Sequence, residues 1–137
     1  MTRIAFFAVA LLALPANAAE KEKPKVETKV YELRVYTVLP GRMKAMNARF
    51  RDHTNKLFIK HGMTLVGYWQ PTDEKEHDRK LIYVLAHASK EAAAKSWKAF
   101  REDPDWIAVR NASEKDGKIV EKVEATFMAP TDYSPLK

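Results

Sequence analysis

The chain has 137 residues, no cysteine, and 24 Lys and Arg residues against 18 Asp and Glu residues, which gives a formal net charge of +6. Hydrophobic residues make up 46% of the sequence, so its composition excludes a disulfide-stabilised scaffold and a highly charged disordered chain. Beyond the N-terminus, no apolar run approaches the ~20 residues that a membrane-spanning helix needs. These features are typical of one small globular domain.

The N-terminus has the pattern of a secretory signal peptide. Arg3 supplies a positive charge, Ile4 to Leu14 form an apolar stretch, and Pro15 to Ala18 end in a small-x-small cleavage box. We therefore expect residues 1–18 to be a signal peptide cleaved after Ala18, and the protein to be exported to the periplasm or secreted. Without this segment no stable membrane insertion is expected. Nucleic acid is not an expected partner, because an exported protein seldom meets it and interleaved basic residues usually form solvated helix faces.

The rest of the chain divides into a leader, one domain and a tail. Residues 19–29 are charged and nearly free of apolar side chains, which is typical of a flexible leader. Residues 30–129 are the expected folded domain, and residues 130–137 a C-terminal tail. The domain begins with Val30 to Val38, whose β-branched and aromatic residues alternate with period two and predict a strand.

Apolar residues recur at helical spacing from Arg42 to Lys60 and predict a helix that His61-Gly62 ends. Its basic residues are expected on a solvated face: Arg42, Lys44, Arg49, Arg51, Lys56 and Lys60. The remaining pattern predicts a hairpin of strands 63–70 and 81–87, a helix over 90–102 capped by Ser89, a short helix that begins at Asp103-Pro104, and a last strand over 119–128.

This order is βαββαβ, which predicts an α+β, ferredoxin-like protomer: a four-stranded antiparallel sheet with helices on one face. The strand from Leu81 to His87 has apolar side chains on both of its faces, and the helices can cover only one of them. The simplest cover for the other face is a second copy of the chain. We therefore expect a homodimer.

Several motifs in this order resemble the NIPSNAP family of the dimeric α/β-barrel group. They are Tyr31-Glu32-Leu33-Arg34 with Tyr36, Pro40-Gly41, His61-Gly62, Gly67-Tyr68-Trp69 and Asp103-Pro104-Asp105-Trp106. The resemblance implies a protomer whose sheet meets its twin to enclose a barrel-like space. It implies less about activity, because related dimeric barrels include monooxygenases, haem-handling enzymes and small-molecule isomerases.

Polar residues of the first strand are candidate ligand-binding residues. Glu32, Arg34 and Tyr36 share one face, and buried charges need a partner or a ligand. In one interpretation Glu32 and Arg34 form an ion pair that fixes the dimer seam. In the other, Arg34 anchors an anionic group of a substrate, Glu32 orients Arg34, and the Tyr36 hydroxyl donates a hydrogen bond.

Three further candidates lie on the expected hairpin. Trp69 and Tyr83 could line an apolar pocket for a planar ligand or fill the dimer centre, and His87, like Tyr36, is a candidate for moving a proton. The histidines show no metal-binding spacing, so no metal site is predicted. No cofactor is predicted either; haem with a histidine ligand is the alternative that the spacing does not support.

Three functions remain open at this point. The first is an exported dimer that binds a small apolar or anionic molecule in a barrel cavity. The second is an enzyme of the cofactor-independent monooxygenase or isomerase type, and the third is a structural or interaction dimer with a solidly packed interior. The sequence leaves open whether the protein is an enzyme, because it has no nucleotide loop, nucleophile elbow, thiol or metal triad.

Overall fold

The computed structural model describes residues 28–137. The expected signal peptide, residues 1–18, and most of the expected leader, residues 19–29, lie outside the described residues. Within this part of the chain the longest helix has 13 residues, and none is long and apolar enough to cross a membrane.

Four strands form one antiparallel sheet: β1 (Val30–Val38), β2 (Thr64–Trp69), β3 (Lys80–His87) and β4 (Val120–Met128). Their order in the sheet is β2-β3-β1-β4, so β1 lies in the middle, next to β3 and β4, and β2 pairs with β3 as the expected hairpin. The order confirms the ferredoxin-like α+β fold.

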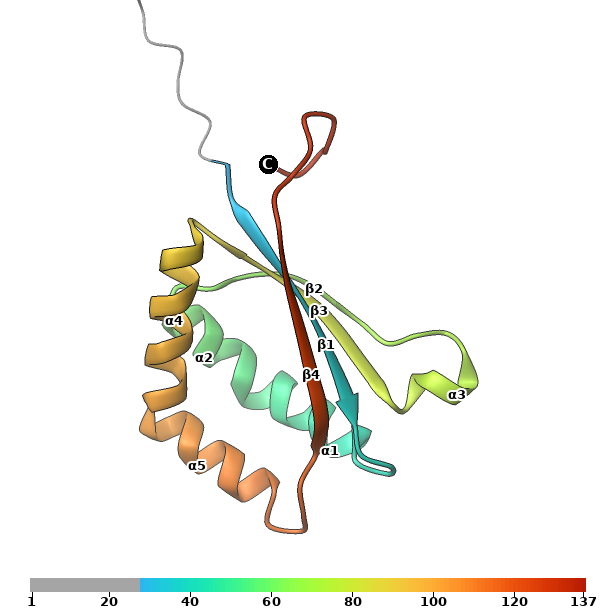
Figure 1. Ribbon diagram of the computed structural model, residues 1–137. Helices are drawn as coiled ribbons and strands as arrows, with labels where there is room; N and C mark the ends of the chain where they lie inside the picture. Colours follow the sequence, from blue (N-terminus) through green and yellow to red (C-terminus); the bar gives the residue numbers. More distant parts are fainter. Residues whose placement is uncertain (1–27) are drawn as a thin grey trace, which may run out of the picture.

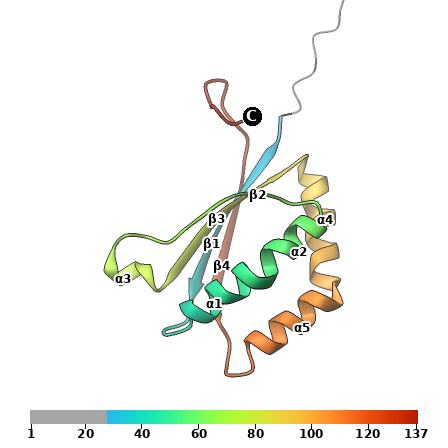
Figure 2. The ribbon, with the colours of Figure 1, turned by 180° about the vertical axis from the view of Figure 1, so that it is seen from behind.

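Helices cover one side of this sheet (Figures 1 and 2). The expected first helix is a continuous rod of α1 (Met43–Arg49), a π-helical segment η1 (Phe50–Thr54) and α2 (Asn55–Lys60). Gly62 follows it with a φ of +79°, a backbone conformation that favours glycine. The sequence pattern did not predict the π-helical turn.

The second helical region consists of α4 (Lys90–Glu102) and α5 (Pro104–Ser113). Both expected N-caps are confirmed. The Ser89 hydroxyl accepts a hydrogen bond from the Ala92 amide at 3.0 Å, and the Asp103 carboxylate accepts one from the Asp105 amide at 2.8 Å. The connection from β2 to β3 contains the short helix α3 (Glu74–His77), where the sequence predicted only a turn.

The hydrophobic core lies between the sheet and these helices. Aromatic rings meet edge to face at its centre, for example Phe58 and Trp97 with centroids 5.3 Å apart. The buried apolar residues come from the sheet, from both helical regions and from the loops: Val38, Met43, Met46, Phe50, Leu57, Phe58, Met63, Leu81, Tyr83, Leu85, Ala93, Trp97, Phe100 and Ile119.

The opposite face of the sheet, here called the open face, has no helix over it (Figure 1). It carries the second set of alternating apolar side chains, of which Val35, Ile82 and Val84 are half-buried and Trp69 is 52% exposed. This confirms that the helices leave one apolar sheet face uncovered. The homodimer that would cover this face stays a prediction.

The C-terminal tail, residues 130–137, turns back toward one end of the open face. The Tyr31 hydroxyl donates a hydrogen bond to the Lys137 carbonyl at 3.0 Å. A pocket of about 290 Å³ lies between the tail and the sheet, and its walls include Val66, Trp69 and Leu136. The tail therefore covers a small part of this face.

Candidate functional site

The sheet divides the six residues that the sequence suggested for a site. Glu32, Arg34 and Tyr36 on β1 share the helix-covered face with Tyr83 and His87 on β3. Trp69 lies on the open face. The five residues therefore lie inside the protomer, between sheet and helices, and Trp69 does not join them.

A β-bulge in β2 explains the position of Trp69. Leu65 pairs with Leu85, but the next pair is Gly67 with Val84, so Val66 is an extra residue. Strict alternation from Leu65 would place Trp69 toward the helices; the extra residue turns it to the open face.

Glu32 is the centre of a buried polar network, and its side chain is only 2% exposed. One carboxylate oxygen accepts a hydrogen bond from Arg34 Nη1 at 2.7 Å. The other oxygen accepts a hydrogen bond from Trp97 Nε1 at 2.7 Å and lies 3.0 Å from His87 Nε2. We assign His87 Nε2 as a donor, because an ionised carboxylate can only accept hydrogen bonds. The network therefore joins β1 to β3 and to α4.

Burial alone would raise the pKa of the Glu32 carboxyl. Hydrogen bonds from His87, Trp97 and Arg34 outweigh this effect and hold that pKa below its ordinary value. Glu32 is therefore an anion that three donors stabilise, and it has no role as a proton donor at neutral pH.

Arg34 is engaged on two sides. Besides the Glu32 ion pair, its guanidinium lies 4.2 Å from the centroid of the Trp97 ring, a cation–π contact. Burial alone would lower the pKa of Arg34, but Tyr36, Tyr83 and Glu32 together raise it. The ion pair that the sequence offered as one alternative is present, but it lies between the sheet and the helices and not on the open face, where a dimer seam was expected. Arg34 Nη1 is used by Glu32, whereas Arg34 Nε is buried without a hydrogen-bond partner among residues 28–137.

Tyr36 and Tyr83 form a hydroxyl pair beside this network. The Tyr83 hydroxyl donates to the Tyr36 hydroxyl at 3.0 Å, which leaves the proton of Tyr36 available to another acceptor. Burial, and then the neighbouring Tyr36, raise the pKa of Tyr83. Tyr83 therefore remains a neutral donor that orients Tyr36.

A cavity of about 200 Å³, here called the inner cleft, lies between the sheet and the helices next to Tyr36. Rings of η1, α2, α4 and α5 form most of its wall, and charged residues lie on one side of it. The lining residues are Tyr36, Arg49, Phe50, Thr54, Phe58, Phe100, Trp106, Arg110, Glu114, Val120 and Val123. Among the residues suggested from the sequence, Tyr36 alone lines it.

Arg49 is the site residue that the sequence analysis missed. We expected it on a solvated helix face, and this was wrong: its side chain is only 4% exposed, between α1 and α5. The helical spacing does indicate that Arg49 is buried, because Arg49 follows Met46 by three residues and directly precedes Phe50. Both Met46 and Phe50 are core residues. A long cationic side chain at the edge of an apolar stripe can lie over that stripe.

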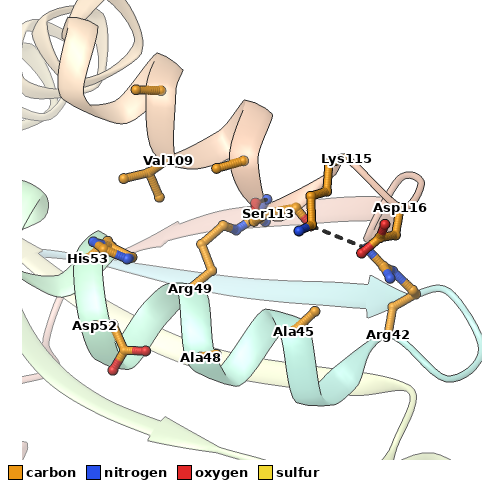
Figure 3. A pocket seen from close by; sticks show the side chains of 12 residues that line it. Arg42, Ala45, Ala48, Arg49, Asp52, His53, Val109, Ser113, Lys115 and Asp116 are labelled. Atoms are coloured by element: carbon orange, nitrogen blue, oxygen red, sulfur yellow. Dashed lines mark hydrogen bonds between the residues drawn. The ribbon is translucent and has the colours of Figure 1, made fainter.

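Figure 3 shows Arg49 rising from α1 toward Ser113 of α5 in a groove between these helices. This outer groove has a volume of about 540 Å³, and its floor includes Ala45 and Ala48. Arg49 lines both the outer groove and the inner cleft. Its side chain therefore stands between the two spaces.

The histidines offer no ligand to the inner cleft. His87 is 1% exposed and bonded to Glu32, and His61 Nε2 lies 2.6 Å from the Asp103 carboxylate. Neither lines that cavity. Within residues 28–137, no group of three or more His, Asp or Glu side chains is arranged to hold a metal ion. The polar side chains that the inner cleft offers to a ligand include the Tyr36 hydroxyl and the Arg49 guanidinium.

Comparison with known proteins agrees with this architecture. The family model described as NIPSNAP matches residues 31–135. A comparison with curated protein sequences finds no significant match.

Several solved structures share the fold. A NIPSNAP family protein of unknown function from Agrobacterium tumefaciens is 23% identical, with a TM-score of 0.70 over 82% of this chain and 96% of that one. Another NIPSNAP family protein from the same organism is 25% identical, with a TM-score of 0.68 over 80% of this chain and 99% of that one. SnoaB, a cofactor-independent oxygenase from Streptomyces nogalater, is 14% identical, with a TM-score of 0.56 over 79% of this chain and 98% of that one. The match to the family model spans nearly the whole described fold, and the chain belongs to the NIPSNAP family.

Proposed function

We propose that this protein binds a small molecule in the inner cleft of each protomer, and that it works as an exported homodimer. The observation that carries the proposal is the inner cleft itself, an aromatic-walled cavity of about 200 Å³ with the polar groups of Tyr36 and Arg49 at its wall. Ligand sites are typically apolar cavities with a few convergent polar groups. A purely structural dimer would need no such space.

The position of the cavity differs from the barrel-like space between two sheets that we expected. The polar candidates of β1 and β3 point toward the helices, whereas the open face has mainly apolar side chains. We therefore assign ligand binding to the inside of the protomer and dimerisation to the open face.

Two features support the homodimer. Val35, Ile82 and Val84 form a contiguous apolar surface on the open face, and a surface of this kind marks an interaction site. In addition, β4 is an edge strand exposed along nearly all of its length, and edge strands readily pair with another chain. Export rests on the signal-peptide pattern at the N-terminus.

A second candidate function is a cofactor-independent oxygenase or isomerase. The fold shared with SnoaB makes this class worth testing, and the Tyr36 hydroxyl supplies a group that could donate a proton or hydrogen bond to a bound substrate. His87 is less suited to this role, because Glu32 holds its Nε2 and its ring does not line the inner cleft.

Native mass spectrometry of the protein purified from its own compartment tests the binding proposal. We expect a mass above that of the bare dimer, and the loss of this extra mass on denaturation. The variant Val123→Trp fills the inner cleft from the exposed strand β4 and should abolish ligand retention. Ile107→Trp adds the same ring at an exposed apolar position outside the cleft lining and should retain the ligand.

Equal retention by both variants would contradict binding in the inner cleft. If a ligand is identified, its turnover by the purified protein decides between a binding protein and an enzyme. A chemically unchanged ligand after prolonged incubation in air would rule out the oxygenase.

A further inference from the structure

We infer that the inner cleft selects a planar aromatic anion, with the Arg49 guanidinium as the anchor of its negative group. This inference rests on the proposed function and specifies the chemistry of the ligand. It assigns to Arg49 the role that the sequence suggested for Arg34.

Arg49 is a buried cation with poor hydrogen-bond partners. Its Nη1 lies 3.4 Å from Glu114 Oε1 and 3.4 Å from Ser113 Oγ, and its Nη2 lies 3.6 Å from the sulfur of Met46. Its Nε is buried and has no hydrogen-bond partner among the residues that the structure describes. A well-formed guanidinium–carboxylate bond is 2.7–2.9 Å long, as it is between Arg34 and Glu32.

Arg49 therefore has donor capacity to spare. A guanidinium has five N–H donors, and a buried charge without full compensation is costly to the fold. Burial lowers the pKa of Arg49, with Glu114 and Tyr36 only partly opposing this effect. An anion that enters the inner cleft would complete its hydrogen bonds.

Aromatic rings give the inner cleft a flat wall. Phe50, Phe58 and Phe100 line the inner cleft together with Trp106, whose ring centroid is 5.4 Å from the Arg49 guanidinium. Flat aromatic walls favour a flat ligand that stacks on them. A volume of about 200 Å³ lies below the 300–1,000 Å³ of sites for drug-sized molecules, so the ligand has about one or two rings.

Glu114, the present counter-ion of Arg49, can be displaced. Glu114 contacts Arg49 at 3.4 Å and its side chain is 29% exposed, so it can turn to solvent when an anion arrives. Arg110 lines the same cleft from the exposed side of α5 and adds positive charge to it. The positive charges of Arg49 and Arg110 would attract an anionic ligand more strongly than a neutral one.

The backbone around Arg49 is also unusual. The π-helical segment begins at the next residue, and Thr54 at its end donates a hydrogen bond from Oγ1 to the Arg49 carbonyl at 3.1 Å. Phe50 and Thr54, the two ends of this segment, both line the inner cleft. π-helical turns are rare and occur frequently at functional sites.

The test compares naphthalene-2-carboxylate with its neutral amide by isothermal titration calorimetry at pH 7. We expect the wild-type protein to bind the acid about 10- to 100-fold more tightly than the amide, because hydrogen bonds to a charged group contribute more to affinity than those to a neutral group. Arg49→Met should remove this preference and leave amide binding in place. Arg51→Gln, which removes an exposed arginine two residues away, should leave the preference unchanged.

Protein stability separates an anchor from a structural arginine. Methionine fills a similar volume beside Met46, and removal of a poorly paired buried charge is often neutral or stabilising. The melting temperature of Arg49→Met should therefore equal or exceed that of the wild type. A lower melting temperature with unchanged affinity for the acid would overturn the inference and make Arg49 structural.

Two further results would overturn the inference but not the proposed function. Equal affinity for acid and amide, with both blocked by Val123→Trp, would show binding in the inner cleft without anion selection. Failure of both probes to bind, with a retained neutral ligand in native mass spectrometry, would show that the cleft selects another chemistry.

Discussion

The Trp97 indole of α4 donates its N–H to the Glu32 carboxylate of β1 at 2.7 Å, across the boundary between helices and sheet. The same indole forms a cation–π contact with Arg34, the ion-pair partner of Glu32. One helical side chain therefore interacts with both charges of the pair. This arrangement stabilises two charges in a place where an apolar core would otherwise be expected, and it fixes the orientation of β1 next to the inner cleft.

Glu32→Gln tests the energetic weight of this network. The amide keeps the shape of the side chain but leaves Arg34 without its buried counter-charge, and breaking a buried ion pair of this kind is costly. We expect the free energy of unfolding to fall by about 3–5 kcal/mol, measured by urea denaturation at pH 7. Glu102→Gln is the control, because Glu102 pairs with Lys98 on the exposed side of α4 and its loss should cost less than ~1 kcal/mol. Similar losses in the two variants would contradict a central role for Glu32.

A second carboxylate, Asp103, makes stability depend on pH. Hydrogen bonds from Lys60 and His61 hold the pKa of Asp103 well below its ordinary value. A carboxyl with a lowered pKa in the folded state stabilises the fold above its unfolded pKa of about 3.9. This contribution is lost as the pH falls toward the lower folded pKa.

Asp103→Asn should therefore lower the melting temperature at pH 7, and the difference from the wild type should shrink below about pH 4. Asparagine still caps α5, so the change isolates the charge. Thermal unfolding between pH 7 and pH 2.5 measures the difference. Asp78→Asn, at an exposed position outside these ion pairs, should follow the wild type throughout. A difference that stays constant with pH would show that the charge of Asp103 is not responsible.

The sequence alone predicted most of the fold, because local signals agree with the tertiary structure. The bounds of β1, the cap residues Ser89 and Asp103, and the turn at Gly62 follow from period-two alternation, side-chain caps and a left-handed backbone. These features depend on neighbouring residues and need no knowledge of distant contacts.

The site was predicted only in part, because its geometry depends on irregularities that periodicity does not reveal. The extra residue Val66 reverses the face of Trp69, and the π-helical turn after Arg49 resembles an ordinary helix at the level of apolar spacing. The Glu32–Arg34 pair was one of two alternatives that strand parity suggested. Its partners His87 and Trp97 come from distant parts of the chain, and only the folded structure identifies them.

Dimerisation through the open face predicts the effect of a charge at its centre. Val84 lies on the middle of β3 and faces away from the helices, so Val84→Glu should leave the protomer folded but place a desolvated carboxylate in the interface. Sedimentation velocity should show a monomer for this variant and a dimer for the wild type. Ile59→Glu changes an exposed apolar residue of α2 and should remain dimeric. A wild-type protein that stays monomeric when concentrated would contradict the proposed assembly.

Removal of either hydroxyl of the Tyr36–Tyr83 pair should lower the free energy of unfolding, but by different amounts. Tyr36→Phe leaves the Tyr83 hydroxyl buried and without its acceptor, whereas Tyr83→Phe leaves the Tyr36 hydroxyl beside the inner cleft, where solvent or a ligand can bond to it. An orphaned buried hydroxyl costs about 1–3 kcal/mol, against ~1 kcal/mol for an ordinary hydrogen bond. Urea denaturation should therefore find Tyr36→Phe the less stable variant.

Ligand affinity should distinguish the same two variants. The loss of the Tyr36 hydroxyl removes a donor at the wall of the inner cleft, which should weaken ligand binding about 3- to 10-fold. Tyr83→Phe removes only the group that orients Tyr36 and should weaken binding less. If both variants bind the retained ligand as tightly as the wild type, then Tyr36 does not contact the ligand. Its hydroxyl would in that case serve only to satisfy Tyr83 in the core.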